Sequence, residues 1–211
     1  PSADMLYDPS YIEDIEVTNE DILHFCSVDL VESAMKQAHS KMIEKFEKVN
    51  GTIVFDPNVR LPLWEDPEAC RQAILEFIPK ANVVKVSDEE LEFITGIKDE
   101  TKAIQSLFKG NVVVVIYTKG PKGAQAFTKN KFTIEHQGYK VKAIDTTGAG
   151  DAFIGAVISR ILTSDMIDVA QLFENEGKSI LKFGNKVAAL TTTRYGAIES
   201  LPTIEEVNKE Y

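Results

Sequence analysis

The chain lacks any apolar run long enough to cross a membrane, although 44% of its 211 residues are hydrophobic. A transmembrane helix needs about 20 consecutive apolar residues, and the longest candidates here are short segments such as residues 112–116. No signal peptide opens the sequence. The sequence therefore predicts a cytoplasmic protein that does not bind membranes.

Cysteine and histidine are scarce, with two and three residues respectively. Cys26 and Cys70 lie far apart within apolar stretches, which favours reduced core thiols over a disulfide. The histidines, His24, His39 and His136, have no metal-ligand spacing, and we interpret them as structural or surface residues.

Basic residues are also few, because the chain has 23 lysines and arginines against 33 aspartates and glutamates, which gives a net charge of -10. A negative protein without a concentrated basic patch repels nucleic-acid backbones and anionic lipids. ATP binding remains compatible with this charge, because nucleotides are held mainly by backbone amides, helix N-termini and cations. The length fits one domain, residues 1–211, with an ordinary hydrophobic core.

Short apolar strands alternate with amphipathic helices along most of the chain. We expect strands at residues 22–27, 52–55, 82–86 and 112–117, and helices at 31–49, 67–78 and within 89–108. This alternation is typical of parallel βαβ units with right-handed crossovers. The sequence therefore predicts an α/β fold with three layers and a mostly parallel sheet.

The second half of the chain shows a different pattern. Residues 123–135 predict a hairpin that turns at Lys129-Asn130, and a further strand is expected at 139–144. Residues 150–192 are predicted to be mostly helical, with an interruption at Gly177 and Gly184.

The most informative segment is Asp-Thr-Thr-Gly-Ala-Gly-Asp-Ala-Phe, residues 145–153. It precedes a helix whose apolar residues fall on one face, namely Ala152, Phe153, Ala156, Val157 and Ile161. Gly148 and Gly150 permit close approach of the backbone to a ligand and tolerate a positive φ. The first-turn amides then form a site for an anion, with Asp151 in the same turn.

This arrangement suits phosphoryl transfer, in which catalysis consists mainly of positioning and charge stabilisation. Asp151 would orient the attacking hydroxyl and accept its proton. A Gly-x-Gly turn alone is a weak signal, however, and an acid at a helix start is often only a favourable dipole partner. The segment lacks the third glycine of a dinucleotide fingerprint, where Phe153 stands, and the lysine of a P-loop.

Residues 145–155 resemble the C-terminal signature of the PfkB, or ribokinase-like, carbohydrate kinases. Four further segments occur in the order that this family shows: residues 55–60, 85–90, 118–123 and 185–197. The Asp-Pro-Asn-Val-Arg stretch at 56–60 is most similar to the fructokinase branch. The resemblance implies a ribokinase-like αβα sandwich and ATP-dependent phosphorylation of a sugar hydroxyl, with fructose as the preferred substrate and ribose, 2-keto-3-deoxygluconate or a nucleoside as alternatives.

The resemblance also implies roles for individual residues. Gly148, Ala149 and Gly150 would form the anion hole, and Asp151 would be the base that activates the sugar hydroxyl. We expect the same carboxylate to contact the sugar.

Four residues would bind ATP, namely Thr118, Gly120, Gly123 and Asn185. The glycines would lie along the nucleotide, although a simple hairpin entrance also explains them. Asn185 would border the adenine, although a buried asparagine capping a helix explains it nearly as well.

Arg60 would contact the sugar, unless it forms a surface ion pair. Glu90 would act on Mg²⁺ through water, unless it only complements a helix dipole. The family often has asparagine where Ser87 stands. A monovalent cation, K⁺ in our interpretation, would be held mostly by carbonyl oxygens of Asp145, Thr147, Thr191, Arg194, Gly196 and Ser200.

The chain departs from the family in one respect. Members begin with a further segment that holds the first strands of the sheet, a Gly-Gly sugar site and a β-lid, and none of these is present in residues 1–211. We interpret the chain as the C-terminal two-thirds of such a kinase. Dimers of the family often use the lid, so a homodimer is one expectation for the complete protein and its oligomeric state stays open. Alone, it is expected to bind ATP and to phosphorylate sugar poorly or not at all. The alternative is a nucleotide-binding module without catalysis.

Overall fold

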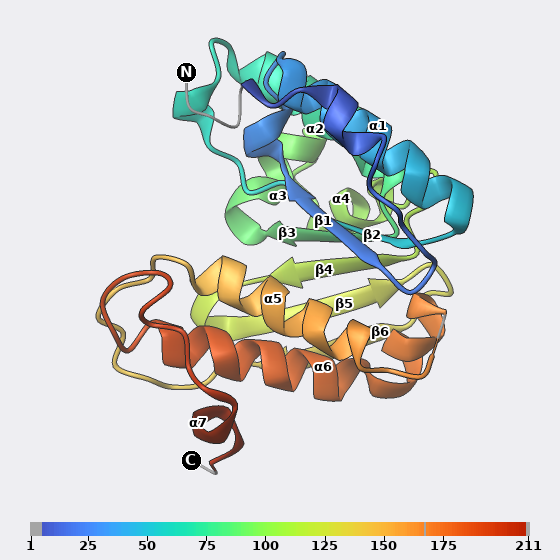
Figure 1. Cartoon of the computed structure of the whole chain (residues 1–211). Coiled ribbons are helices and arrows are strands. Elements are labelled where there is room, and N and C mark those ends of the chain that lie inside the picture. The colour runs from blue at the N-terminus through green and yellow to red at the C-terminus, as the bar shows by residue number, and fades with distance from the viewer. Residues whose placement is uncertain (1–5, 167, 210–211) are drawn as a thin grey trace. The chain divides into compact units, whose positions relative to one another are not determined.

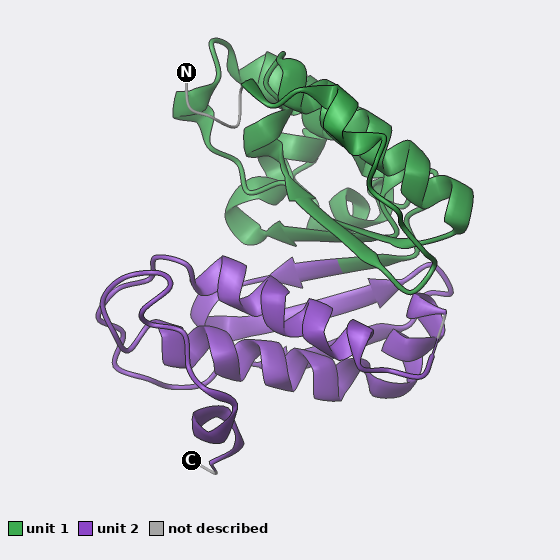
Figure 2. Ribbon diagram, viewed as in Figure 1, with its two compact units in different colours: residues 1–115 green, residues 116–211 purple. Residues whose placement is uncertain are grey.

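The computed structural model describes residues 6–166 and 168–209, which form an α/β fold (Figure 1). The chain divides into two compact units, Pro1–Val115 and Ile116–Tyr211 (Figure 2). Each unit has strands and helices of its own, and each is described separately below.

The first unit contains three parallel strands in the order β1 (Ile22–Cys26), β2 (Thr52–Asp56) and β3 (Val83–Ser87). The β1–β2 register joins all five residues of each strand, from Ile22↔Thr52 to Cys26↔Asp56. Because β2 and β3 are buried along almost their whole length, they consist mainly of valine, isoleucine and phenylalanine.

Helices connect these strands, as the alternation in the sequence predicts. Ser33 caps the first of them by accepting a hydrogen bond from the Lys36 amide, and Asn50 ends it in the left-handed conformation at φ 56°. The helices are α1 (Ala34–Val49), α2 (Pro67–Phe77), α3 (Asp88–Thr95) and α4 (Glu100–Ser106), with 3-10 turns η2 (Pro9–Ile12), η3 (Ser27–Leu30), η4 (Leu61–Leu63) and η5 (Ile78–Lys80).

Aromatic side chains fill part of the core of the first unit. The rings of Phe25 and Phe55 stack with their centroids 4.6 Å apart, and Phe77 meets Phe25 edge-on at 6.0 Å. Both cysteines are free, as expected, and burial raises the pKa of the Cys70 thiol to about 11.

The second unit begins within β4 (Val114–Thr118) and continues through η6 (Gly120–Lys122) into β5 (Gly123–Thr128) and β6 (Thr133–Gln137). β5 and β6 pair antiparallel, which confirms the hairpin predicted around Lys129-Asn130. Its helices are α5 (Ala149–Leu162), α6 (Val169–Thr191) and α7 (Ile204–Asn208), and α6 packs against α5, β5 and β6.

The strand predicted at residues 139–144 is wrong, because residues 139–143 have no regular secondary structure. The amides of Ile144 and Asp145 both donate to one carbonyl, that of Thr192, instead of joining a ladder. Val141 and Ile144 are 36% and 49% exposed, so their apolar side chains do not form the buried face of a strand.

The interruption predicted at Gly177 and Gly184 is also wrong, since α6 runs unbroken through both glycines. A Cβ atom added at Gly184 would lie 2.9 Å from the Phe153 ring, and one at Gly177 would lie 3.3 Å from Ile134. The glycines therefore let α6 approach α5 and β6 closely. The helical region is broken between Leu162 and Val169 instead.

None of the helices in the described part of the chain combines the length and the apolar character that a membrane span requires.

The glycine packing makes a testable prediction with a matched control. Gly184→Ala should lower the free energy of unfolding by about 1–3 kcal/mol, because the new methyl group overlaps the Phe153 ring. Gly155→Ala should raise it by about 0.5–1 kcal/mol, because that glycine lies in α5 with open space at its Cβ position and alanine favours helix. Urea unfolding of the three proteins measures both shifts, and equal stability of the two variants would contradict the packing of α6.

Candidate functional site

The glycine-rich segment forms the start of α5, as the sequence predicts. Gly148 is the N-cap residue and has a left-handed conformation at φ 76°. A Cβ atom at this position would also lie 3.1 Å from the Cβ atom of Ala197. Glycine is therefore required at position 148 both by the backbone conformation and by close packing.

The first turn of α5 has no capping side chain, and of its amides that of Ala149 donates to the Thr146 carbonyl at 3.2 Å. Gly148 has no side chain that could accept a bond from them, and the first bond into the helix runs from the Ala152 amide to the Gly148 carbonyl at 2.8 Å. Gly150 and Asp151, both exposed, lie in this turn. The positive end of the helix dipole makes the turn suitable for an anion.

Positive φ accounts for only one of the two glycines, since Gly150 is part of the helix. The apolar face predicted for α5 is confirmed, because all five of its residues are buried: Ala152, Phe153, Ala156, Val157 and Ile161. This face anchors the helix in the second unit, so the first turn is held at a defined position.

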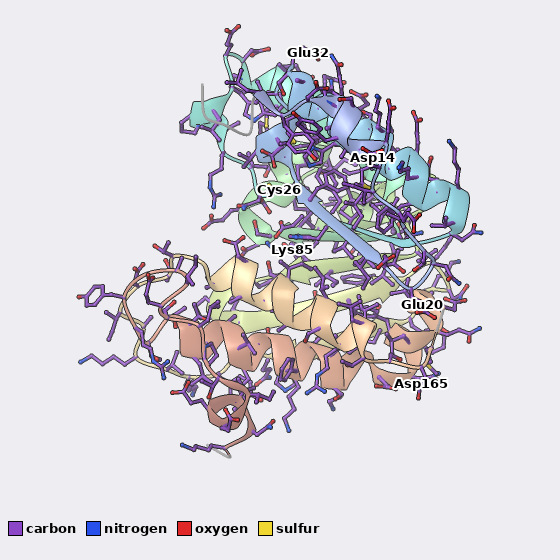
Figure 3. All side chains as sticks on the ribbon, in the orientation of Figure 1. Asp14, Glu20, Cys26, Glu32, Lys85 and Asp165 are labelled. Carbon is purple, nitrogen blue, oxygen red and sulfur yellow. The ribbon has the colours of Figure 1, made fainter. Side chains whose placement is uncertain are left out.

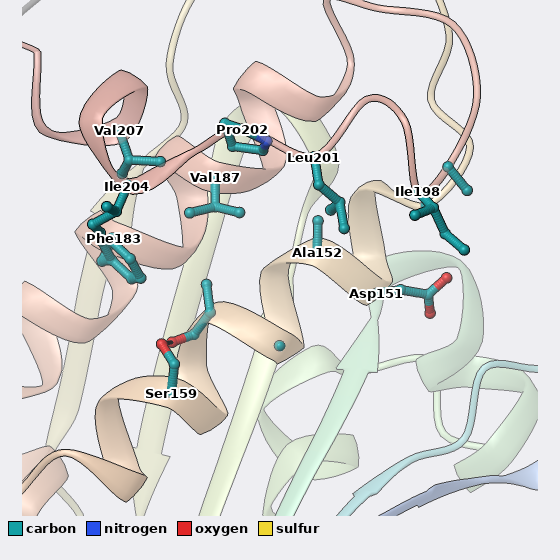
Figure 4. A pocket seen from close by; sticks show the side chains of 14 residues that line it. Asp151, Ala152, Ser159, Phe183, Val187, Ile198, Leu201, Pro202, Ile204 and Val207 are labelled. Atoms are coloured by element: carbon teal, nitrogen blue, oxygen red, sulfur yellow. Dashed lines mark hydrogen bonds between the residues drawn. The ribbon is translucent and has the colours of Figure 1, made fainter.

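Gly148 and Asp151 stand at one end of a pocket of about 470 Å³ within the second unit. In Figure 4, side chains of α6 and of residues 198–207 face α5 across this pocket, with the Asp151 carboxylate beyond its apolar part. The apolar lining includes Phe183, Val187, Ile198, Leu201, Pro202, Ile204 and Val207. Such a lining suits a hydrophobic body rather than a phosphate. Sequence reasoning missed this pocket, although the apolar residues between 198 and 207 signal it.

The loop at residues 118–123 contains both predicted ATP-binding glycines, and their surroundings differ. Gly120 has a φ of 50° and nothing within 4 Å of its Cβ position. Gly123 has a φ of 101°, and a Cβ there would lie 2.2 Å from the His136 carbonyl oxygen. The hairpin entrance thus requires Gly123 for its own packing. Gly120 is exposed, and Thr118, the last residue of β4, is half-buried.

Asn185 does not cap a helix, because it lies in the middle of α6. Its amide nitrogen donates to the carbonyl oxygen of His136 at 2.9 Å and lies 3.2 Å from the Nδ1 atom of the same residue. The side chain is 7% exposed. Asn185 therefore ties α6 to the end of β6, a role that neither sequence interpretation included.

Hydrogen bonds bring part of the predicted cation site together. One carboxylate oxygen of Asp145 accepts from the Thr147 amide at 2.9 Å and from its hydroxyl at 2.7 Å. The other accepts from the Gly196 amide at 3.1 Å. The segment before α5 is thus joined to the segment after α6, 51 residues away in sequence.

Of the remaining residues of this set, Thr191 is the last residue of α6, and Arg194 and Ser200 lie in the segment that follows it. Thr191 is fully buried and donates to the Val187 carbonyl, and Ser200, also fully buried, donates to the Ala197 carbonyl at 2.8 Å. Arg194 forms an ion pair with Glu206. No group of three or more His, Cys, Asp or Glu side chains suited to a metal occurs within residues 6–166 and 168–209. A site built from carbonyl oxygens, as predicted, does not depend on such a group.

Two of the predicted site residues, Arg60 and Glu90, belong to the first unit. Glu90 completes a capping box at the start of α3, where its Oε2 atom accepts from the Ser87 amide and hydroxyl at 2.9 and 2.8 Å. Its Oε1 atom accepts from the Val59 amide at 2.7 Å. Arg60 is exposed, and its guanidinium donates to the Val59 carbonyl at 3.1 Å.

Sequence reasoning missed a buried ion pair between Lys85 and Asp56. The Lys85 Nζ atom lies 2.8 Å from Asp56 Oδ2, and the side chains are 7% and 2% exposed. A lysine inside the apolar run Val83-Val84-Lys85-Val86 was the available signal, because a buried lysine requires a partner.

The Asp145 contacts predict a pH-dependent loop. The pKa of Asp145 lies below its ordinary value of 3.8, first because of the Thr147 hydroxyl and then because of the Thr147 and Gly196 amides. Because the pKa is lowered in the folded state, the contacts stabilise the fold at pH values above the unfolded-state pKa. This stabilisation is lost as the pH falls through the lower, folded-state pKa. The NMR amide shifts of Thr147 and Gly196 should therefore titrate with a midpoint below 3.8. Asp145→Asn should abolish that titration, and a midpoint above 3.8 in the parent would contradict the contacts.

Comparison with known proteins gives a consistent result. Residues 2–204 match the model of the pfkB family of carbohydrate kinases. Fructokinase-2 of Solanum lycopersicum is 38% identical over 209 residues, which cover 98% of this chain and 62% of that protein. Probable fructokinase-3 of Arabidopsis thaliana is 38% identical over 206 residues, which cover 96% of this chain and 58% of that protein.

Solved structures agree with these sequence matches. The fructokinase of Vibrio cholerae bound to fructose, ADP and calcium has a TM-score of 0.85 and 32% identity, covering 98% of this chain and 65% of that one. The aminoimidazole riboside kinase of Salmonella enterica, bound to aminoimidazole riboside and an ATP analogue, has a TM-score of 0.86 and 25% identity. The match covers 99% of this chain and 67% of that one.

The chain spans about three-fifths of the length of the curated relatives it matches. The expected α/β, ribokinase-like fold is confirmed by its strands and helices and by the likeness to these kinases. With almost the whole chain matched by the family model, the protein belongs to the pfkB family of carbohydrate kinases.

Proposed function

We propose that the complete polypeptide transfers the γ-phosphoryl group of ATP to a hydroxyl group of a sugar, with fructose as the first acceptor to test. The observation that carries this proposal is the start of α5, where Gly148 leaves the first-turn amides without a capping side chain and Asp151 lies in the same turn. The relatives named fructokinase, at 38% identity, support fructose.

In the proposed reaction, the sugar hydroxyl oxygen forms a bond to the γ-phosphorus while the bond to the bridging oxygen of ADP breaks. Asp151 orients the hydroxyl and receives its proton. The amides of Gly148, Ala149 and Gly150 stabilise the negative charge that spreads over the transferring group. ADP leaves with the bridging oxygen, so atoms and charge balance.

Nucleotide and cation binding follow from the same proposal. Thr118 and Gly120 line the ATP in the more open part of their loop, and Gly123 and Asn185 hold the neighbouring backbone in place. Mg²⁺ would supply charge neutralisation. Within the first unit, Glu90 keeps acceptor capacity beyond its bonds from Val59 and Ser87, with which it would hold a water of such an ion. The segment joined by Asp145 and Gly196 would place carbonyls around K⁺, an ion that a Vibrio cholerae fructokinase structure contains.

A second candidate, a nucleotide-binding module without catalysis, is favoured by one observation. The 211-residue chain spans about three-fifths of the relatives' length, so groups that position a sugar in those proteins can lie outside it. Nucleotide affinity without turnover would then be the property of this chain.

Substitution of Asp151 separates the two candidates. In the complete natural polypeptide that contains these residues, Asp151→Asn should lower sugar-dependent ADP release by about 10²–10⁴-fold, because the proton acceptor is lost. ATP affinity, measured by calorimetry, should stay close to that of the parent. The assay should compare fructose, ribose, 2-keto-3-deoxygluconate and a nucleoside.

Asp165→Asn is a matched control, because Asp165 is an exposed acid beyond the other end of α5 (Figure 3). It should leave turnover and ATP affinity unchanged. Parent protein that binds ATP but phosphorylates none of these acceptors would favour the binding module, and Asp151→Asn protein with full turnover would remove Asp151 from the reaction.

A further inference from the structure

Two buried charges of the first unit meet at the end of β2, beside the middle of β3. Asp56 is the last residue of β2, and Lys85, which is labelled in Figure 3, lies in β3. The Lys85 Nζ atom donates to both carboxylate oxygens of Asp56, at 3.0 and 2.8 Å. The side chains are 7% and 2% exposed, so water does not screen the pair.

This ion pair continues the register of the two strands. Val54 pairs with Val83 and Phe55 with Val84, and the next residue of each strand is the charged one. Side chains at matching positions of neighbouring strands interact directly. The pair therefore fixes the end of β2 against the middle of β3, directly before the loop that follows β2.

Stability alone is a poor explanation for such a pair. Removing two charges from water is costly, and apolar residues of similar volume often stabilise a buried site as well or better. What an ion pair adds is directional geometry, because the ammonium group must face both oxygens of one carboxylate. That geometry suits a place where the position of a strand end matters.

The loop that follows Asp56 is fixed by further contacts. The Pro57 carbonyl accepts from the Ser27 amide at 2.9 Å, which ties the loop to the end of β1. The Val59 amide donates to Glu90 at 2.7 Å, which ties it to the start of α3. Asn58, between these anchors, has a left-handed backbone at φ 46°. The loop thus spans three neighbouring strand ends.

Arg60 follows these anchors directly. Its guanidinium is exposed and contacts only the adjacent Val59 carbonyl among the hydrogen bonds described for it, so the path of the loop sets its direction. An arginine fork recognises oxygen atoms with a defined geometry, and a small misplacement of such a group is costly for a reaction.

We propose that the Asp56–Lys85 ion pair is a positioning device, which sets the path of the loop at residues 57–60 and thereby the direction in which Arg60 presents its guanidinium to a sugar. The role in sugar binding rests on the proposed function. The role in setting the path of the loop rests only on contacts within the first unit. Asp56 and Lys85 are positioning residues, because they act through the loop.

The test compares an apolar replacement of the pair with a matched destabilised variant. Asp56→Leu/Lys85→Met removes both charges while keeping the site filled, so neither charge is left buried and unpaired. Ile74→Ala, at a fully buried position of α2, lowers stability and leaves both charges of the pair in place. Asp56→Glu keeps the charge but displaces the carboxylate by one methylene, and serves if the double variant does not fold.

The first readout is hydrogen exchange in the 211-residue chain, with the Val59 amide compared with the Val54 amide inside β2. The double variant should keep the urea midpoint of the parent, while its Val59 amide exchanges about tenfold faster or more relative to Val54. Ile74→Ala should lower the urea midpoint and leave the ratio of the Val59 exchange rate to the Val54 exchange rate unchanged. Asp56→Glu should raise the ratio as well.

The second readout is steady-state kinetics of the complete natural polypeptide that contains these residues. The double variant should raise the KM for the sugar about tenfold or more, with the KM for ATP unchanged. Ile74→Ala should leave both constants unchanged at a temperature where it is folded. Parent-like exchange and sugar KM in a folded double variant or in Asp56→Glu would overturn the proposal.

The two proposals can fail separately. A parent protein without sugar kinase activity would refute the proposed function, whereas the exchange ratio at Val59 would still decide whether the ion pair sets the loop. An active parent whose variants change only the urea midpoint would refute the positioning role and leave the proposed function intact.

Discussion

Close backbone packing at Gly148 is the constraint on which the candidate site depends. The Cβ position of Gly148 would lie 3.1 Å from Ala197, so any larger residue would push the start of α5 away from the segment that follows α6. The hydrogen bond from Gly196 to Asp145 joins the same two segments. This contact adds to the anchoring of α5 by its buried face, and both fix the direction of the first-turn amides.

Two aspartates flank this contact and have different tasks. Asp145 accepts three hydrogen bonds from Thr147 and Gly196, which lower its pKa and keep it ionised as part of the scaffold. Asp151 is exposed in the first turn of α5, where a bound group can reach it. One carboxylate thus helps to build the loop, and the other lies at the surface, where the proposed reaction would use it.

Local signals in the sequence were sufficient for some parts of the molecule and not for others. The start of α5 was predictable because a glycine, an acid and one apolar face are all local properties of residues 145–161. The apparent strand at 139–144 depended on a neighbouring strand that the sequence could not reveal, and its amides at Ile144 and Asp145 meet a single carbonyl instead. Glycine in α6 looked like a break because the Phe153 ring that fits against Gly184 is distant in sequence.

The same limit explains why the contacts of the first unit escaped prediction. Parallel strands deliver their carboxyl ends to one edge of a sheet, so loops that are about 30 residues apart in sequence become neighbours there. Three contacts join the end of β2 or the loop after it to a neighbouring strand or to the segment that follows that strand: Ser27 with Pro57, Asp56 with Lys85, and Val59 with Glu90. Each residue alone looks like an ordinary turn or surface residue. Lys85 is the exception, because a lysine within a buried strand already implies an acidic partner, and the strand order then leaves few places for it.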